Sequence, residues 1–170
     1  MFVSSVCFLL PAAVLLCAAA WRDLAARTIP DLVSLSLAGA SLLSRAAEGW
    51  QALGISVVVA LSLFALLLLL AMRGALGGGD VKLAAAMALG LSPAATWDFI
   101  FATVMIGGVL GLLYLAGPHL VPRFRATAGS SLLRRILAVE SWRLRRRGPV
   151  PYGVAIAGGG ILVLLGAPGS

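Results

Sequence analysis

Residues 57–70 read Val-Val-Val-Ala-Leu-Ser-Leu-Phe-Ala-Leu-Leu-Leu-Leu-Leu, a stretch without a single charged side chain. It lies inside a longer apolar run, Ala52–Met72, which is long enough for a helix that crosses a bilayer. The rest of the chain is similar in character, because 61% of its 170 residues are hydrophobic and only 11% are charged. One soluble core cannot bury that much apolar surface, and a disordered chain has the opposite composition. The composition therefore predicts an all-α polytopic membrane protein.

Apolar runs divide the chain into about six transmembrane spans of a single membrane domain, residues 1–170. The fourth run is the weakest and is interrupted at residues 90–93, Gly-Leu-Ser-Pro. We interpret the first run as a retained helix and not a cleaved signal peptide, because its basic residue, Arg22, follows the apolar run. The six predicted spans are Phe2–Trp21, Asp31–Ala46, Ala52–Met72, Val81–Thr96, Phe99–Gly117 and Val150–Gly166.

Basic residues alternate between the predicted loops. The first, third and fifth loops hold 12 of the 13, and the second holds only Arg45. The positive-inside rule then places the odd loops in the cytosol and both termini on the outer, periplasmic or extracellular, face. We attribute the net charge of +7 to this orientation and to anionic lipid, and we expect no nucleic-acid partner. Most of the charge lies in a basic cytosolic loop at about 118–149, where Ser131–Arg147 resembles an amphipathic helix on the inner leaflet.

Residues that could bind a metal ion are scarce. Cys7 and Cys17 are the only cysteines, His119 is the only histidine, and no Cys-x-x-Cys motif occurs. On one helix the two cysteines would lie roughly 15 Å apart, which is too far for a disulfide. We therefore expect no metal site and no cofactor, and the sequence argues against a His-Glu-x-x-His metalloprotease or a Ser-His protease.

Acidic side chains are the remaining candidates for chemistry. Three are expected to be solvated surface charges, two of them in outer loops and one among arginines: Glu48, Asp98 and Glu140. The other three lie at the cytosolic ends of predicted spans: Asp23, Asp31 and Asp80. An acid beside an apolar helix end is costly, so each of these three is a functional hypothesis.

Each of these acids also has a structural interpretation. Asp80 follows Gly77-Gly78-Gly79 and could cap the fourth span, although three glycines also let backbone or substrate approach its carboxylate. Asp23 could be an interface charge at the end of the first span. In Thr28-Ile29-Pro30-Asp31, Thr28 has the pattern of an N-cap and Asp31 that of its capping-box partner. We therefore expect Asp31 to be structural.

Two aspartates at a membrane edge can perform hydrolysis together. Carboxylates that share a site do not both ionise easily, so the pair retains one proton. The ionised member can activate a water molecule while the protonated member polarises a carbonyl group, as in an aspartic protease. A proton-coupled transporter could use the same pair as a relay, and composition leaves both classes open.

Three segments resemble motifs of the type IV prepilin peptidases. Residues 77–83, Gly-Gly-Gly-Asp-Val-Lys-Leu, are similar to the G-x-G-D-x-K segment of that family. Residues 23–31, Asp-Leu-Ala-Ala-Arg-Thr-Ile-Pro-Asp, resemble its first aspartate segment. Residues 151–157, Pro-Tyr-Gly-Val-Ala-Ile-Ala, resemble the final-helix motif of the short branch of the Tad/Flp pilus system, the CpaA/TadV-like peptidases. The three segments occur in order over nearly the whole chain, which makes the resemblance specific.

The resemblance implies an aspartic endopeptidase of the bacterial inner membrane that cleaves the basic leader of Flp-type prepilins on the cytosolic side. Its two catalytic residues fall on Asp23 and Asp80. The motif and an expected substrate groove add six further residues: Gly77, Gly79, Lys82, Pro151, Tyr152 and Gly153. The chain lacks the Cys-x-x-Cys insertion of the longer, N-methylating members, so we predict no methyltransferase activity.

Two alternatives follow from the same residues. The first is a small proton-coupled transporter or pilus-assembly membrane protein with structural aspartates, and a homo-oligomer is compatible with either function. The second is a presenilin-like G-x-G-D protease, but that class is longer and carries a Pro-Ala-Leu motif that this chain lacks.

Overall fold

The computed structural model describes residues 2–120 and 150–166. Within those ranges the chain is helical and contains no strand, which confirms the predicted all-α class. The predicted basic loop, with Glu140 and the amphipathic segment Ser131–Arg147, lies almost entirely outside the described residues. The helices are α1 (Phe2–Ala26), α2 (Asp31–Glu48), α3 (Trp50–Met72), α4 (Gly78–Leu89), α5 (Pro93–Leu120) and α7 (Tyr152–Gly166).

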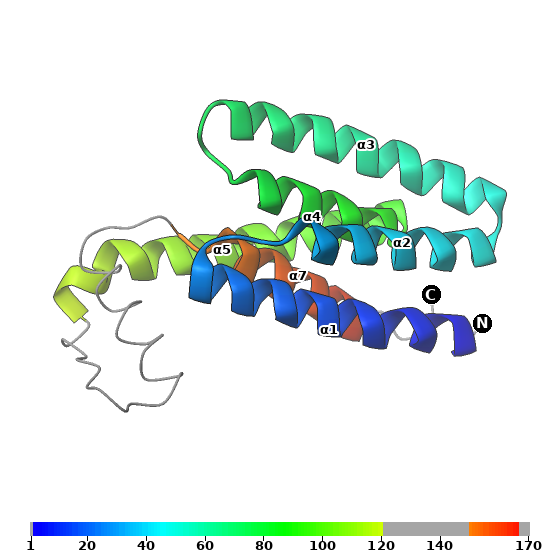
Figure 1. Cartoon of the computed structure of the whole chain (residues 1–170), viewed down its shortest axis with the longest axis horizontal. Helices are drawn as coiled ribbons and strands as arrows, with labels where there is room; N and C mark the ends of the chain where they lie inside the picture. Colours follow the sequence, from blue (N-terminus) through cyan, green and yellow to red (C-terminus); the bar gives the residue numbers. More distant parts are fainter. Residues whose placement is uncertain (1, 121–149, 167–170) are drawn as a thin grey trace.

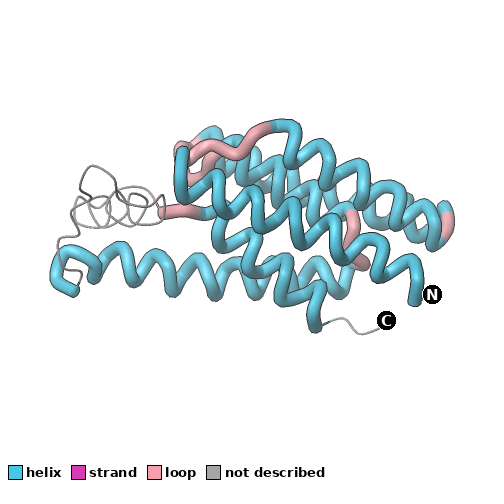
Figure 2. Tube along the Cα trace, turned by 60° about the horizontal axis from the view of Figure 1, so that its bottom comes forward, coloured by secondary structure: helices cyan, strands magenta, loops and turns pink. Residues whose placement is uncertain are grey.

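The helices form an antiparallel bundle in which successive helices reverse direction (Figure 1). Both chain ends lie at one end of this bundle. The α1–α2 and α3–α4 connections and the start of α7 lie at the opposite end, which we call the acidic end because it carries Asp23, Asp31 and Asp80. Short loops join the helices in the part described (Figure 2). The first and third loops of the sequence therefore lie at the same end of the molecule as the start of α7.

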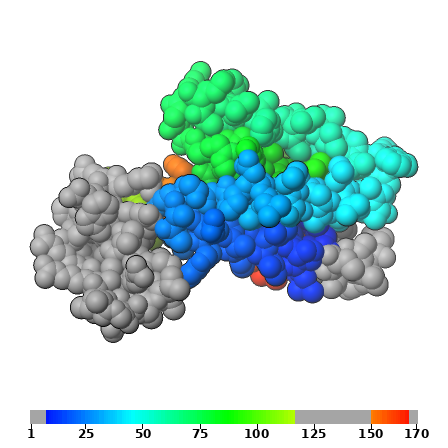
Figure 3. Space-filling model, viewed as in Figure 1, coloured from blue at the N-terminus to red at the C-terminus, as the bar shows by residue number. Residues whose placement is uncertain are grey.

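Two helices occupy the interior of the bundle. Helix α4 packs against α2 and α3, and α7 packs against α1 and α5. Helix α7 approaches α5 closely because Gly159 has no side chain: a Cβ there would lie only 2.8 Å from the backbone nitrogen of Thr103. Figure 3 shows the face of the bundle that carries α2 and α3, and leucines and valines of these two helices are among the exposed residues. Such a surface suits a lipid environment.

Three helices are long and apolar enough to cross a membrane: residues Phe8–Ala26 of α1, Trp50–Met72, which is the whole of α3, and Pro93–Ala116 of α5. Helix α7 is apolar but shorter, with 15 residues, and α4 has only 12. At 1.5 Å per residue, α4 is about 18 Å long and cannot by itself cover a hydrocarbon core of about 30 Å. By length and composition, three of the six predicted spans are thus supported in the described part of the chain.

The predicted fourth span, Val81–Thr96, is wrong at its end. Helix α4 stops at Leu89, and Thr96 belongs to α5. The physical reason is a helix start at Ser92: its Oγ accepts a hydrogen bond of 3.2 Å from the N–H of Ala95, and proline occupies the first helical position. The same start places Asp98 on the exposed face of α5 and not in a loop.

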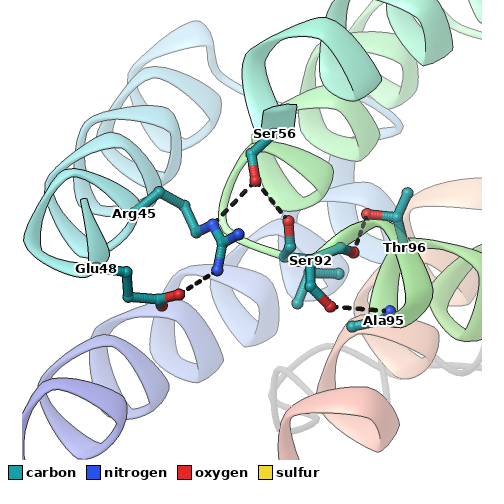
Figure 4. A network of polar contacts seen from close by, with 7 residues as sticks. Arg45, Glu48, Ser56, Ser92, Ala95 and Thr96 are labelled. Carbon is teal, nitrogen blue, oxygen red and sulfur yellow. Dashed lines mark hydrogen bonds and ion pairs between the residues drawn. The ribbon is translucent and has the colours of Figure 1, made fainter. Parts of the chain in front are cut away.

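A buried arginine stabilises the end of the bundle opposite the acidic end (Figure 4). Arg45 is only 8% exposed, and its Nε donates a hydrogen bond of 2.9 Å to Ser56 Oγ. Ser56 in turn donates to the carbonyl oxygen of Leu91, also at 2.9 Å. Glu48, expected to be a solvated loop charge, ends α2 and forms an ion pair with Arg45. The network joins α2, α3 and the α4–α5 connection.

Candidate active site

Asp23 lies in the last turn of α1 and is only 7% exposed. Its Oδ2 accepts a hydrogen bond of 2.9 Å from the backbone N–H of Gly153, in the first turn of α7. A Cβ at position 153 would lie 2.9 Å from this Oδ2 and 3.0 Å from the Cβ of Asp23, closer than side chains pack. The absence of a side chain at Gly153 is therefore what lets α7 begin directly against the carboxylate. Helix α7 begins at Tyr152, directly after Pro151.

Asp80 is the third residue of α4, whose N-cap is Gly77. The interpretation of Asp80 as the N-cap is therefore wrong. Its carboxylate instead lies against Gly77, whose backbone lowers the pKa of Asp80. A Cβ at position 77 would lie 2.9 Å from Asp80 Oδ2, so glycine also makes room for this carboxylate. Asp80 Oδ1 is buried and has no hydrogen-bond partner among the described residues.

A second glycine of this segment sets the position of α4. A Cβ at Gly79 would lie 3.1 Å from the Cβ of Ile29, in the connection between α1 and α2. Glycine therefore lets the start of α4 pack on the connection that follows α1, the helix that carries Asp23. By contrast, a Cβ at Gly78 would have no neighbour within 4 Å. The first and third glycines thus have steric roles that the second does not.

The two carboxylates act on each other electrostatically. Burial raises the pKa of Asp80, and the negative charge of Asp23 raises that pKa further. The backbone hydrogen bond from Gly77 and the positive charge of Arg27 lower the pKa of Asp80 in part. Asp80 precedes the apolar residues of α4 and lies outside the three candidate spans. The pair therefore keeps a proton to a higher pH than an ordinary aspartate does.

Sequence reasoning did not predict a role for Arg27 or Tyr114 in this cluster. Arg27 Nη2 donates a hydrogen bond of 2.6 Å to the hydroxyl oxygen of Tyr114 on α5, and the guanidinium carbon lies 5.7 Å from the centre of the tyrosine ring. Arg27 has a positive φ of 54°, a conformation that costs a non-glycine residue roughly 1–2 kcal/mol. One signal was available: Arg27 follows Asp23 by four positions, the spacing at which helical side chains meet. No pattern in the sequence points to Tyr114.

Asp31 and Lys82 pair with each other at the acidic end. Lys82 Nζ lies 2.7 Å from Asp31 Oδ1, and the two side chains are 50% and 76% exposed, respectively. Asp31 is the first residue of α2, and the N-cap is Pro30, without a side-chain hydrogen bond. The predicted capping box from Thr28 to Asp31 is therefore wrong, because the proline takes the cap position and leaves Asp31 free to reach Lys82.

Tyr152 lines a cavity of about 510 Å³ between α3, α4, α5 and α7. The cavity is mainly apolar and also reaches Leu76, next to the N-cap of α4. Tyr152 is partly exposed, and the residue after it, Gly153, holds Asp23. A larger cavity, of about 700 Å³, lies between α2, α3 and α4 and is lined by Asp31 and Lys82 but not by Asp23 or Asp80. Neither cavity is lined by Asp23 or Asp80, but the smaller one is lined by Tyr152, the residue before Gly153, whose N–H donates to Asp23.

The acidic end can perform acid–base chemistry with its own side chains. It brings together a buried carboxylate held by a helix start and a second carboxylate that retains a proton. Among residues 2–120 and 150–166, no group of three or more histidines, cysteines, aspartates or glutamates could hold a metal ion. The arrangement fits activation of water by one carboxylate and donation of a proton by the other.

Comparison with known proteins gives one match. The model of the type IV leader peptidase family matches residues 10–115. The matched part includes both Asp23 and Asp80 and ends before α7 begins. No curated protein and no solved structure matches the chain.

Proposed function

The chain belongs to the type IV leader peptidase family, and from this premise we propose that it cleaves the leader of Flp-type prepilins as an aspartic endopeptidase. Family membership makes it a membrane peptidase with a prepilin substrate and does not favour a proton-coupled transporter. The observation that carries the aspartic mechanism is the influence of Asp23 on the pKa of Asp80 at one end of the bundle. Two carboxylates that interact in this way can divide the roles of base and acid.

We assign the base to Asp23. Its carboxylate accepts a backbone N–H at the start of α7, and both this hydrogen bond and the positive end of the helix stabilise a negative charge. Asp23 takes a proton from a water molecule, and the resulting hydroxide adds to the scissile carbonyl carbon. Asp80 gives its proton to the carbonyl oxygen in the same step.

The intermediate is then a tetrahedral diol with neutral oxygens. Its carbon–nitrogen bond breaks as Asp23 gives the proton it took to the leaving nitrogen. Asp80 recovers its proton from one of the diol hydroxyl groups, and a new carboxyl terminus is left on the leader. Both aspartates return to their starting protonation states, so the cycle needs only water and the peptide.

The location of the reaction follows from charge. Arg22, Arg27, Arg73 and Lys82 lie at the acidic end, while Arg45 lies at the opposite end with Glu48. The positive-inside rule then supports a cytosolic acidic end, outer termini and, in a bacterium, insertion in the inner membrane. Cleavage would therefore occur at the cytosolic face, where a basic leader also meets anionic lipid.

The start of α7 supports two parts of the proposal: assignment to the Flp branch and the position of the substrate groove. Pro151, Tyr152 and Gly153 lie beyond the matched part of the family model, yet Gly153 contacts Asp23 and Tyr152 lines the cavity beside it. An extended scissile segment needs space and backbone partners next to the catalytic groups. We propose that this segment lies along Tyr152 at the mouth of the 510 Å³ cavity.

Co-expression tests the proposal directly. The full chain is produced with a Flp-type prepilin in a bacterial host without its own prepilin peptidase, and the pilin N-terminus is determined by mass spectrometry. We expect removal of the leader just after a glycine and an unmethylated new N-terminus. Uncleaved prepilin beside a correctly inserted peptidase would refute the proposed substrate, and cleavage only of prepilins from other pilus systems would refute the branch.

A further inference from the structure

We propose that Arg27 is a positioning residue for this reaction: its guanidinium ties α5 to the end of α1 through Tyr114 and supplies a fixed positive charge beside the two aspartates. The role of Arg27 in catalysis rests on the proposed function. It concerns a residue outside the two carboxylates and their supporting glycines.

The contact with Tyr114 joins two helices at the acidic end. Helix α5 packs mainly on α7, whereas Arg27 directly follows α1. The hydrogen bond of 2.6 Å from Arg27 Nη2 to Tyr114 bridges 87 positions of sequence, and the tyrosine is only 7% exposed. The tyrosine ring also lies within the distance at which a guanidinium is attracted to an aromatic face. Arg27 is thus held in one place by a partner on another helix.

The backbone conformation of Arg27 indicates that its side chain has a role at this site. Its φ of 54° is in the left-handed region, where glycine is the residue without strain. The N–H of Arg27 still donates a helical hydrogen bond of 2.9 Å to the carbonyl oxygen of Asp23. The strained conformation therefore places the arginine immediately after the turn that carries Asp23. A strained residue that keeps a large side chain beside candidate catalytic groups points to a role for that side chain.

The charge of Arg27 acts on the carboxylates. It lowers the pKa of Asp80 against the effects of burial and of Asp23. Within residues 2–120 and 150–166, the other charged groups at this end are exposed: Arg22 on α1, the Asp31–Lys82 ion pair and Arg73 after α3. The hydroxyl group of Tyr114 on α5 contacts Arg27, and Tyr152 on α7 lines the 510 Å³ cavity. Among the described residues, Arg27 is the cation that acts on Asp80.

Removal of this charge should move the titration of Asp80. A nearby positive charge favours an ionised carboxylate, so the pKa of Asp80 should rise when the charge of Arg27 is lost. Cleavage needs Asp80 in its protonated form, and activity falls at the pH where Asp80 loses its proton. The alkaline limb of the pH profile should therefore shift to higher pH.

The test compares three substitutions of Arg27 with one matched control at Arg22 and with one substitution of its partner, Tyr114. Arg27→Gly removes the side chain and its contacts with Tyr114, and the relief of backbone strain at a positive φ offsets part of that loss. Arg27→Lys keeps the charge but not the planar contact with Tyr114, and Arg27→Gln removes the charge while keeping a long polar side chain. Arg22→Gln removes a neighbouring exposed cation that does not act on Asp80. Tyr114→Phe keeps the ring and removes only the hydroxyl group.

Two measurements are made on the full chain in liposomes. The first measurement is an infrared titration, which needs no substrate. It follows the band of the protonated Asp80 carboxyl group as a function of pH, and this band is identified by its absence in Asp80→Asn. We expect the loss of this band to shift to higher pH in Arg27→Gly and Arg27→Gln, but not in Arg27→Lys or Arg22→Gln. The second is the pH profile of prepilin cleavage, which should shift in the same direction in the same two variants. Tyr114→Phe should reduce cleavage severalfold without shifting either profile.

An unshifted infrared titration in a folded Arg27→Gly protein would overturn the proposal, as would an equal shift in Arg22→Gln. Wild-type protein that cleaves no prepilin would refute the proposed function, while the infrared titration would still decide the role of Arg27.

Discussion

The backbone N–H of Gly153 donates a hydrogen bond of 2.9 Å to Asp23 Oδ2 and joins residues 130 positions apart in the sequence. One carboxylate of the candidate pair is therefore positioned by the first turn of the last helix. The other, Asp80, is positioned within its own segment by Gly77 and by the contact of Gly79 with Ile29. The position of each aspartate thus depends on a neighbouring glycine.

A valine at position 153 should inactivate the peptidase. Its Cβ would lie 2.9 Å from Asp23 Oδ2, so α7 or the carboxylate must move. A displacement of about 1 Å at reacting groups can cost about a hundredfold in rate, and we expect at least that loss in kcat/KM for Gly153→Val. Gly39→Val is the matched control, since a Cβ at this position of α2 has no neighbour within 4 Å. Normal cleavage by a folded Gly153→Val protein would show that the start of α7 does not position Asp23.

Alanine substitutions should separate the three consecutive glycines. Gly78→Ala should retain full cleavage and stabilise α4 by about 0.5–1 kcal/mol, because its Cβ meets nothing and alanine favours a helix. Gly77→Ala and Gly79→Ala should each lower kcat/KM by about tenfold or more, because their Cβ atoms would press on Asp80 and on Ile29. Cleavage rates and thermal unfolding of the three variants give the comparison. Equal behaviour of all three would contradict the steric roles.

The Asp31–Lys82 ion pair should matter little for cleavage. Both partners are at least half exposed, and such pairs contribute about 0–1 kcal/mol. Asp31→Asn and Lys82→Met should therefore change kcat/KM by no more than about threefold. If Asp31→Asn folds but does not cleave, the base is Asp31 and the assignment to Asp23 is wrong.

Much of the fold could be predicted from sequence because each apolar run that crosses a membrane reverses the direction of the chain. The alternation of basic loops then places Asp23, Asp31 and Asp80 at one end, as the bundle has them. The end of α4 could not be predicted in the same way, since the start of α5 depends on the local hydrogen bond of Ser92. The polar contacts of Asp23 and Arg27 connect residues far apart in sequence, and periodicity carries no information about such pairs.

The raised pKa of Asp80 also predicts how stability depends on pH. Between the ordinary pKa of an aspartate, about 4, and the raised value, the folded protein binds more protons than the unfolded chain. Stability due to this group is therefore full at low pH, falls through that window and stays reduced above it. Asp80→Asn removes the effect, so this variant should unfold at a higher temperature than the wild type at neutral pH. The difference should shrink as the pH is lowered through the window, and thermal unfolding at several pH values measures it. A lower unfolding temperature of Asp80→Asn at neutral pH would contradict the burial of this carboxylate.

The central claim is that Asp23 and Asp80 act as one catalytic unit, and kcat/KM for prepilin cleavage by three variants tests it most directly. We predict that Asp23→Asn and Asp80→Asn each lose on the order of 10⁴-fold or more, and that the double variant loses no more than either one, since groups that act as a unit are not additive. All three variants should insert in the membrane and show a cooperative thermal unfolding transition. The loss of kcat/KM then comes from the chemical step and not from misfolding. Substantial cleavage by either single variant, or losses that add in the double variant, would contradict the shared-proton mechanism.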